Sequence, residues 1–271
     1  MKPLDGLDQL GFAVLPKLAA DARIPIERLW DSVAHLHAGG FSATIMLADT
    51  HVRRSVHMTL APALAQLTRL LSAWRPVVCG FANKDAGSHA PMPPHQDITL
   101  VDETAGSALS LWMPMLDVGS SNGCLRVVPG SHRLNSAPRA PGTPFAAQYL
   151  EDRLRAHHSV ELALEAWQPV VIDQRLFHES GSNVSDASRP VVTAALIPAD
   201  QPLRYYHRTM GDAGAVLEGF MVPDDFLLDH RLGCRPERGI CFGAWPERSD
   251  IISMEMLSTL PSTFISQQTT G

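Results

Sequence analysis

His95 and Asp97 lie two positions apart, directly after Pro93 and Pro94, in the stretch HAPMPPHQDITLVDE. On an extended segment the side chains at i and i+2 point to the same face, so the imidazole and the carboxylate would converge and could bind one metal ion. A His-x-Asp triplet is expected about once by chance in a chain of this composition. The pair alone is therefore explained more simply by a surface loop or a solvated strand end, and other residues must decide.

His178 is the histidine that adds most to this pair. It closes the apolar run PVVIDQRLF where the chain enters the polar stretch HESGSNVSDASRP, and a histidine at a strand end lies at the rim of a sheet. Most of the other histidines lie among polar neighbours or in predicted helices, where surface or capping roles explain them better. His178 is therefore the second candidate histidine ligand.

Arg189 begins the apolar run that follows this polar stretch. If the two runs are neighbouring antiparallel strands, Arg189 returns close to His178, where its guanidinium could bind a carboxylate through two parallel hydrogen bonds. A buried arginine beside this cluster would be costly unless an anion meets it. For this segment alone, an ordinary surface arginine in a hairpin is the simpler interpretation.

Two histidines and one carboxylate on one face of a metal ion leave three positions open, an arrangement typical of non-haem Fe(II) oxygenases. 2-Oxoglutarate would fill two of them through its oxo and C1 carboxylate groups, and dioxygen would take the last. Its distal carboxylate would need a cation, for which Arg189 is the candidate. Together the four residues predict Fe(II), 2-oxoglutarate and dioxygen as cofactor and co-substrates.

Short apolar runs predict the strands that would position these residues. They are rich in Val, Ile, Leu and aromatic residues and are bounded by Gly, Pro, Asn and Ser, at 76–84, 108–116, 124–132, 168–178 and 190–198. Helical spacing is found at 25–40, 61–74 and 149–167. Several strands with few helices between them predict an antiparallel sandwich or barrel, and among these the jelly roll encloses a site in its mouth.

The length of 271 residues fits one mainly β domain with flanking helices. We expect a single domain over 1–271, with N-terminal helices at about 1–75, a jelly-roll core at about 76–198 and C-terminal elements at 199–265. Residues 133–167 and 199–250 exceed ordinary loop length. Both are predicted to cover the cavity and set substrate choice, the first as a lid insert.

The composition excludes several classes of partner. With 22 Lys and Arg against 28 Asp and Glu, the net charge is −6, and without a Lys/Arg run no nucleic-acid partner is expected. No run of 18 apolar residues predicts a membrane span, and the first residues do not look like a signal peptide. Four cysteines without a C-x-x-C pair predict reduced thiols in a cytoplasmic protein. We expect a monomer or homodimer with a small-molecule substrate.

Three blocks in order resemble the phytanoyl-CoA dioxygenase (PhyH-like) family of Fe(II)/2-oxoglutarate oxygenases: HQD at 95–97, LWMPMLDVGSSNGCLRVVPGSHR at 111–133 and HESGSNVSDASRP at 178–190. The resemblance covers about residues 76–198. It implies a double-stranded β-helix, which is a cupin-like jelly roll, with iron ligands at His95, Asp97 and His178 and a 2-oxoglutarate anchor at Arg189. It also implies that the hydroxyl of Ser180 meets the same distal carboxylate. Further cofactor-binding residues implied by the family are Asn83, Lys84, Thr99 and Trp112.

The expected reaction is hydroxylation of a C–H bond with release of succinate and CO2. Relatives that halogenate carry Gly or Ala at the position of Asp97, so halogenation is not expected, whereas desaturation, ring closure and epoxidation stay open. The candidate substrate-binding residues are Met92, Arg204, Tyr205 and His207. No basic cluster suggests a site for CoA phosphates, which favours a natural-product intermediate or an amino-acid derivative. The alternative is a cupin-type metal-dependent isomerase or hydrolase, or a ligand-binding jelly roll, that does not use 2-oxoglutarate.

Overall fold

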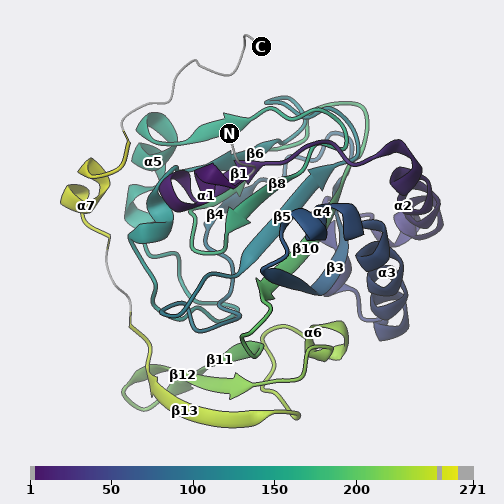
Figure 1. The fold of residues 1–271 in the computed structure, drawn as a ribbon. Helices are drawn as coiled ribbons and strands as arrows, with labels where there is room; N and C mark the ends of the chain where they lie inside the picture. Colours follow the sequence, from purple (N-terminus) through teal and green to yellow (C-terminus); the bar gives the residue numbers. More distant parts are fainter. Residues whose placement is uncertain (1–3, 249–251, 262–271) are drawn as a thin grey trace.

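The computed structural model describes residues 4–248 and 252–261 of the chain (Figure 1). Its main sheet has six strands in the order β1-β8-β5-β10-β3-β2. In that order they are Phe12–Val14 (β1), Val170–Asp173 (β8), Leu109–Pro114 (β5), Arg189–Pro198 (β10), Trp74–Lys84 (β3) and Phe41–Ala43 (β2). Every pair of neighbours is antiparallel. The edge strands β1 and β2 lie within about 1–75, the part expected to hold the N-terminal helices, so that part contributes strands to the sheet as well.

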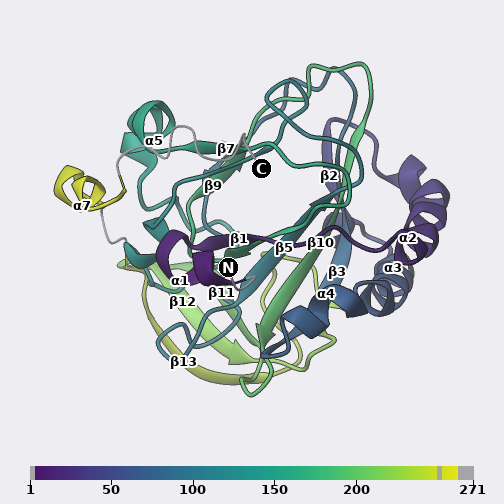
Figure 2. The same cartoon turned by 45° about the horizontal axis from the view of Figure 1, so that its top comes forward.

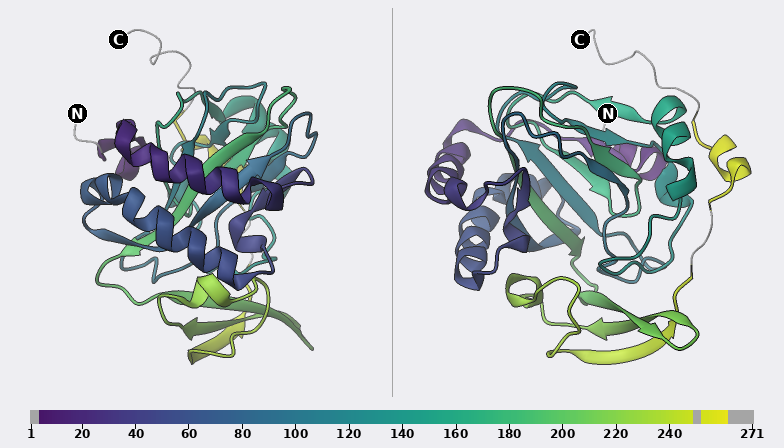
Figure 3. Two further views of the ribbon diagram at one scale, coloured as in Figure 1. Left: turned by 90° about the vertical axis from the view of Figure 1, so that its right-hand side faces the viewer. Right: turned by 180° about the vertical axis from the view of Figure 1, so that it is seen from behind.

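A second sheet of four strands has the order β4-β9-β6-β7. Its strands are Met92–His95 (β4), His178–Ser180 (β9), Leu125–Val127 (β6) and Val160–Leu162 (β7). These pairings are antiparallel as well. The two sheets face each other, as Figure 2 and the rear view in Figure 3 show, and residues of both line one cavity. The predicted fold class, a double-stranded β-helix with flanking helices, is confirmed.

Helices cover the outer face of the six-stranded sheet beside β3 (Figures 1 and 3). They are Ala20–Val33 (α2), Thr50–Ala63 (α3) and Ala65–Leu70 (α4), while Asp5–Leu10 (α1) precedes β1. Helix α3 begins after Asp49, whose carboxylate accepts hydrogen bonds from the backbone N–H groups of His51 and Val52 at 2.8 and 3.2 Å. Short 3-10 helices are found at Ala34–Leu36 (η1), Thr44–Met46 (η2) and Ser131–Arg133 (η3).

Strand β10 shows how the six-stranded sheet separates the core from the cavity. Val192 and Leu196 pack in the core together with the helices, whereas Arg189, Thr193 and Ala195 line the cavity on the other face. Successive side chains of a strand point to opposite faces, so one strand serves both environments.

The C-terminal part adds a separate three-stranded sheet, seen as the lowest layer in Figure 1. Its strands are Arg204–Gly211 (β11), Gly214–Met221 (β12) and Ile240–Pro246 (β13), and the short helix Phe226–Asp229 (α6) packs beside it. A second short helix, Met254–Ser258 (α7), lies apart from this sheet, where Leu257 packs in one cluster with Leu154 and Phe177. One hydrophobic cluster joins this sheet and α6 to the ends of β3 and β10. The buried Arg53 of α3 donates hydrogen bonds to the carbonyl oxygens of Leu227 and, at 2.7 Å, of His230, which ties α6 to the helical layer.

Two predicted elements differ from the structure. Residues 149–167 do not form one helix; a 3-10 turn at Gln148–Leu150 (η4) and helix Glu151–His157 (α5) are followed by β7, because pairing with β6 overrides the local helical pattern. The run 168–178 is not one strand either. β8 ends at Asp173, whose carboxylate accepts a hydrogen bond from the backbone N–H of Arg175 at 2.8 Å in the turn that follows. His178 therefore begins a strand of the opposite sheet.

The described part of the chain contains no helix that is long and apolar enough to cross a membrane. The predicted C-terminal boundary at residue 265 lies outside the described residues. Cys79, Cys124, Cys234 and Cys241 are all free thiols.

Candidate active site

Strand register places His95 and His178 directly opposite each other on β4 and β9. Their ring centroids are 4.1 Å apart. Strand β4 lies at the edge of its sheet and has no neighbour on its outer side. Proline has no backbone N–H to donate, and Pro93 and Pro94 are tolerated here because no further strand needs that hydrogen bond. The register shifts between Met92 and His95, so both prolines fall into the irregular part of the pairing.

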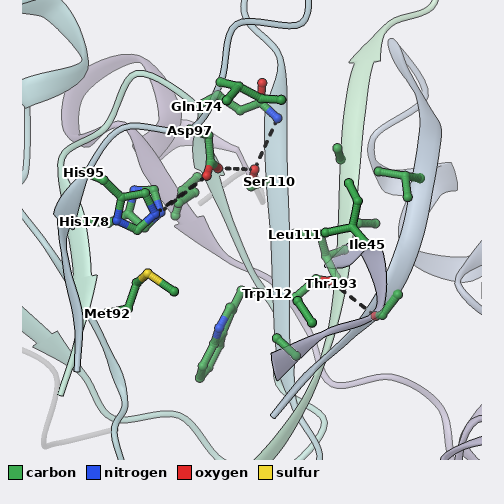
Figure 4. Close-up of a pocket in the computed structure, with 18 of the residues that line it drawn as sticks. Ile45, Met92, His95, Asp97, Ser110, Leu111, Trp112, Gln174, His178 and Thr193 are labelled. Carbon is green, nitrogen blue, oxygen red and sulfur yellow. Dashed lines mark hydrogen bonds and ion pairs between the residues drawn. The ribbon is translucent and has the colours of Figure 1, made fainter. Parts of the chain in front are cut away.

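Asp97 lies just beyond the end of β4 and completes a cluster of three possible metal ligands (Figure 4). Its Oδ1 lies 3.9 Å from Nε2 of His95 and 3.8 Å from Nε2 of His178. The backbone N–H of Asp97 donates to the carbonyl oxygen of Gln174 at 3.0 Å, which fixes the segment that follows the strand. One ligand atom from each of the three side chains lies within 4.8 Å of the others. The structure thus brings together the three residues selected from the sequence.

Each histidine of this cluster is oriented through its other ring nitrogen. Nδ1 of His95 lies 2.8 Å from the carbonyl oxygen of Pro93, and Nδ1 of His178 lies 2.9 Å from that of Leu176. Because a carbonyl oxygen only accepts hydrogen bonds, each Nδ1 carries the proton and each Nε2 offers its lone pair to the centre of the cluster. This is the tautomer that a metal ligand requires.

Ser110 of β5 fixes the third ligand. Its hydroxyl donates to Oδ2 of Asp97 at 2.5 Å, and the side-chain amide of Gln174 donates to the Ser110 oxygen at 3.3 Å (Figure 4). The hydroxyl proton is therefore directed at Asp97, and Oδ1 is left to face the two histidines.

Burial and mutual contacts set the charge state of the cluster. Burial raises the pKa of Asp97, but His178, His95 and the hydrogen bond from Ser110 outweigh it and hold that pKa below its ordinary value. Burial, followed by the proximity of His95, lowers the pKa of His178. An ionised carboxylate beside neutral imidazoles is the form that binds a metal cation.

A cavity of about 380 Å³ lies between the two sheets and is lined by the three candidate ligands and by Arg189. Arg189 is only 2% exposed, and burial lowers the pKa of its guanidinium to about 10. Among the described residues its Nε has no hydrogen-bond partner and no carboxylate offsets its charge. The ring of Trp112 lies 5.4 Å from the guanidinium carbon. A buried cation that lines a cavity without an acid of its own is suited to bind an anion.

Ser180, Trp112 and Met92 line the same cavity. Ser180 of β9 is the cross-strand partner of Met92 on β4, and Figure 4 shows Met92 and Trp112 next to the histidine pair. Their predicted roles toward 2-oxoglutarate and the substrate stay predictions.

Lys84, Asn83 and Thr99 do not line the cavity, and the structure corrects their predicted role in cofactor binding. The ammonium group of Lys84 donates to the carbonyl oxygen of Ser180 at 3.0 Å, which ties β3 to the end of β9. The side-chain amide of Asn83 donates to a backbone carbonyl at 3.0 Å, and the hydroxyl oxygen of Thr99 accepts from the backbone N–H of Arg139 at 3.0 Å. The donor groups of Lys84 and Asn83 and the hydroxyl oxygen of Thr99 are thus bound within the protein, whereas Oδ1 of Asn83 has no hydrogen-bond partner among the described residues.

Arg204, Tyr205 and His207 also lie away from the cavity lining, on β11 of the three-stranded sheet. Arg204 forms an ion pair with Asp102 at 3.0 Å. Tyr205 is fully buried, and its hydroxyl oxygen accepts a hydrogen bond from the backbone N–H of Gly233 at 2.9 Å. Their predicted contact with substrate is corrected, because the sheet that carries them packs beside the cavity rather than around it.

The two segments predicted as covers differ in what they give to the cavity. Residues 133–167 contribute no side chain to its lining, so they are not a lid in this structure. Residues 199–250 contribute Leu227 of α6 and Leu232. Nothing in the local sequence marks these leucines, because they reach the cavity only through the packing of a distant element.

Ser110 and Gln174 are site residues that the sequence interpretation missed. The sequence does hold a signal for Ser110, because it lies two positions before Trp112 on β5 and residues two apart on a strand share one face. Gln174 lies in the turn after β8 and carries no comparable pattern.

Two facing antiparallel sheets that enclose a His, Asp and His cluster beside a buried arginine define a class of protein, the double-stranded β-helix oxygenases that hold non-haem iron. A family model described as Phytanoyl-CoA dioxygenase (PhyH) matches residues 25–191, which is more than half of the chain and contains all four of these side chains. The chain belongs to this family. Its members use Fe(II), 2-oxoglutarate and dioxygen, so the family and the cofactors predicted from the sequence are confirmed.

Curated relatives include Phytanoyl-CoA dioxygenase domain-containing protein 1 of Mus musculus, which is 33% identical over 188 residues, or 65% of this chain and 60% of that protein. The protein of the same name from Danio rerio is 28% identical over 152 residues, or 53% of this chain and 52% of that protein. The matched part thus spans between about half and 60% of these relatives.

Solved structures with this fold include the epimerase SnoN in complex with Fe3+, alpha ketoglutarate and nogalamycin RO, with a TM-score of 0.56 and 21% identity over 74% of this chain and 84% of that one. The non-heme alpha ketoglutarate dependent carbocyclase SnoK from nogalamycin biosynthesis has a TM-score of 0.56 and 20% identity, covering 74% of this chain and 85% of that one. At these identities the likeness concerns the fold.

Proposed function

We propose that the protein is an Fe(II)- and 2-oxoglutarate-dependent oxygenase that hydroxylates a C–H bond of a small organic molecule. One oxygen atom of dioxygen would enter the substrate as a hydroxyl group, the other would enter succinate, and 2-oxoglutarate would lose CO2. Arg189 carries the proposal, because a buried cation with no acid partner among the described residues, in the same cavity as the ligand cluster, calls for an anionic ligand.

The donor set of His95, Asp97 and His178 fits a ferrous ion. When bound, the iron supplies the redox chemistry that couples oxidation of 2-oxoglutarate to oxidation of the substrate. The chain itself does the positioning. The two Nδ1–H groups hold the imidazole rings through backbone carbonyls, and Ser110 holds the carboxylate so that one oxygen faces the imidazoles.

The guanidinium of Arg189 and the hydroxyl of Ser180 are the proposed partners of the distal carboxylate of 2-oxoglutarate. Each hydrogen bond to a charged group contributes roughly 1.5–3 kcal/mol net, and a guanidinium can form two of them to one carboxylate. The Trp112 ring beside Arg189 adds a cation–π contact and covers the guanidinium on one side.

Halogenation is disfavoured because Asp97 occupies the position where halogenating relatives have Gly or Ala, and hydroxylation is the proposed outcome. SnoN is described as an epimerase and SnoK as a carbocyclase, so this fold serves other outcomes in those proteins. A product mass that exceeds the substrate mass by one oxygen atom would identify hydroxylation. A cytoplasmic setting and a monomeric or homodimeric state are part of this proposal.

Loading the protein with Fe(II) without oxygen and then adding 2-oxoglutarate tests the proposal. A weak visible charge-transfer band should appear, and admission of oxygen should yield succinate. A cupin-type isomerase, hydrolase or binding protein would give neither signal. A fully iron-loaded protein that shows no band with 2-oxoglutarate would overturn the proposal.

A further inference from the structure

The charged groups on the cavity wall all have partners or proposed ligands. Five ionisable residues of the described chain line the cavity: His95, Asp97, His178, Glu179 and Arg189. Three form the ligand cluster, and Arg189 faces the co-substrate. Glu179 is neutralised from outside the cavity by Arg155 at 2.8 Å, with Arg126 at 3.9 Å. No charge is left among them for an ammonium or a carboxylate group on the second substrate.

Most neutral polar side chains of the wall are engaged as well, although Oε1 of Gln174 has no hydrogen-bond partner among the described residues. The side-chain amide of Gln96 donates to the backbone carbonyl of Asn135 at 3.2 Å. Its Oε1 accepts a hydrogen bond from the side-chain amide of Asn135 at 3.1 Å. Thr193 donates to the carbonyl oxygen of Gly80 at 3.3 Å, and Ser110 donates within the ligand cluster. A strongly polar substrate would therefore find few partners here.

An apolar wall adjoins the ligand cluster. It consists of six residues of one hydrophobic cluster that also line the cavity: Val78, Ile98, Leu100, Ala195, Leu227 and Leu232. Ile98 directly follows Asp97, and Ala195 is the cross-strand partner of Ser110, which binds Asp97. Ala195 lies six positions beyond Arg189 on β10, which is about 20 Å of strand. The apolar wall thus begins at the ligand cluster and lies away from the co-substrate anchor.

We propose that the second substrate is an uncharged molecule that buries a hydrocarbon part, such as a ring or a branched chain, against the apolar wall. The inference rests on the proposed function, since it names the substrate class of the same site. An unpaired charge buried here costs far more than apolar contact returns, so a free amino acid is excluded by its ammonium and carboxylate groups. An amino-acid derivative fits only if both charges are masked.

Part of this selectivity comes from outside the segment that the family model matches. Leu227 and Leu232 lie beyond residue 191, and Arg53 holds α6 in place through the carbonyl oxygen of Leu227. The position of α6 therefore shapes the space available next to the ligand cluster.

Three probes with one carbon skeleton test the proposal: neutral cyclohexanecarboxamide, anionic cyclohexanecarboxylate and cationic cyclohexylmethylamine. The protein is loaded with Zn(II) and N-oxalylglycine, an unreactive analogue of 2-oxoglutarate, so that Arg189 is occupied. Ligand-observed NMR then measures binding. We expect the neutral probe to bind at least about tenfold more tightly than either charged probe, which corresponds to about 1.4 kcal/mol. Equal or tighter binding of a charged probe, or no binding of the neutral probe at millimolar concentration, overturns the proposal.

A variant pair sharpens this test. Leu232→Glu places a carboxylate in the apolar wall at a half-buried position, and it should weaken the neutral probe by about tenfold and strengthen cyclohexylmethylamine. Ile240→Glu, at a 67% exposed position of β13 outside the cavity, should change neither. The charge-transfer band with Fe(II) and 2-oxoglutarate is recorded for the same proteins. A missing band contradicts the proposed function, whereas a normal band with a preference for a charged probe contradicts only the substrate class.

A second and independent observation concerns Arg139, which lies in the segment predicted as a lid. Its Nε donates to the carbonyl oxygen of Asp97 at 2.8 Å, and its backbone exchanges hydrogen bonds with Thr99 at 2.9 and 3.0 Å. The rest of its guanidinium binds Glu103, with side-chain exposures of 6% and 3% for the pair. Residues 96–108 contain no helix or strand, so these hydrogen bonds hold a segment that no strand pairing supports.

We infer that Arg139, paired with Glu103, is a positioning residue for Asp97. Breaking one side of a buried ion pair leaves an uncompensated charge, so the test replaces both partners, as Arg139→Met with Glu103→Leu. The folded apoprotein should bind Mn(II) about 10- to 100-fold more weakly than the parent, as expected when a group that orients a ligand is lost. Arg208→Met with Glu247→Leu removes an ion pair beside the three-stranded sheet, outside the cavity, and should leave the Mn(II) affinity unchanged.

Unchanged Mn(II) affinity in a folded double variant would show that the Arg139–Glu103 pair is only structural. If the double variant does not fold, Arg139→Lys decides, because lysine keeps the charge beside Glu103 but cannot also reach Asp97 with a second donor. In that case weakened Mn(II) binding at an unchanged melting temperature of the apoprotein supports the inference, and unchanged binding refutes it.

Discussion

The two ends of the cavity are built by different means. The polar end consists of His95, Asp97, His178 and Arg189, all within the segment that the family model matches. Directional hydrogen bonds and strand register set its geometry. The apolar wall instead owes its shape to close packing and draws on residues beyond that segment, including Leu227 of α6. The polar end thus lies wholly within the matched segment, whereas the apolar wall combines residues of that segment with residues beyond it.

This difference makes the two ends separable by mutation. Changes at the polar end should alter metal or 2-oxoglutarate binding and leave the neutral probe largely unaffected. Changes in the apolar wall should do the reverse. A variant of one end that disturbs the other would break the comparison.

The largest effect is expected from loss of a candidate metal ligand. His95→Ala, Asp97→Ala and His178→Ala should each abolish succinate formation and lower the iron content below one per chain, because two ligands hold the ion poorly. Circular dichroism should remain near that of the parent, since these side chains line a cavity. Leu232→Ala is the control and should keep its iron. Full activity in any of the three variants, at one iron per chain, would refute the ligand assignment.

Arg189 offers the next largest effect at the polar end. Arg189→Ala removes two charge-assisted hydrogen bonds to the distal carboxylate, so the KM for 2-oxoglutarate should rise by a factor of about 10² or more. Arg189→Lys keeps the positive charge but loses the planar pair of donors, so its KM for 2-oxoglutarate should be intermediate. Iron affinity should not change, because Arg189 is not part of the ligand cluster. An unchanged KM in Arg189→Ala would favour the cupin-type alternative.

The polar end could be predicted from the sequence because its chemistry restricts residue type. A metal centre needs imidazoles and a carboxylate, and His-x-Asp is visible as local spacing. The predicted route by which Arg189 approaches His178 was nevertheless wrong. β10 pairs with β3 and β5, whereas β9 pairs with β4 and β6, so the two residues line one cavity from different sheets and do not belong to one hairpin. Residue types and local spacing identify the site residues, but long-range strand pairing determines where they lie.

The residues predicted around the site show the same limit. Lys84 has a suitable residue type, but its ammonium group is bound to backbone carbonyls. Tyr205 was selected as an aromatic substrate contact, yet it is buried in the core beneath the three-stranded sheet. The length of residues 133–167 showed that this segment is unusual, but length alone does not distinguish a lid over the cavity from a segment that supports the site. These outcomes depend on which distant elements pack together, and one sequence does not contain that information in local form.

Ser110 provides a smaller effect that separates orientation of a ligand from its identity. Ser110→Ala removes the hydrogen bond to Oδ2 of Asp97, and loss of such an outer contact typically weakens metal binding by about 10- to 100-fold. Titration of the apoprotein with Mn(II) measures it. Thr193→Val is a matched control in the same cavity, because its hydroxyl binds only Gly80 and not the ligand cluster. If both variants bind Mn(II) like the parent, Ser110 does not orient Asp97.

The smallest effect concerns pH and the side of the cavity formed by β2 and η2. His37 is fully buried, and burial lowers its pKa below the ordinary 6.5. Its Nδ1 lies 3.1 Å from the hydroxyl of Ser42, and its Nε2 lies 3.3 Å from that of Thr44. These contacts support the short segment that brings Ala43 and Ile45 to the cavity lining.

The sign of the pH effect follows from which state binds the proton more readily. The pKa of His37 is lower in the folded protein, so the unfolded chain takes up the proton first, and stability that is complete above about pH 6.5 declines as the pH falls. The melting temperature of the apoprotein should therefore drop between pH 7 and pH 5.5. His37→Gln cannot titrate, and it should melt lower at pH 7 but lose less on acidification. Burial also lowers the pKa of His57 and His132, so some slope should remain in this variant. Equal slopes of melting temperature against pH in the parent and in His37→Gln would show that His37 takes up no proton on unfolding. A neutral-probe affinity that stays constant over the same pH range in both proteins would confine the effect to stability.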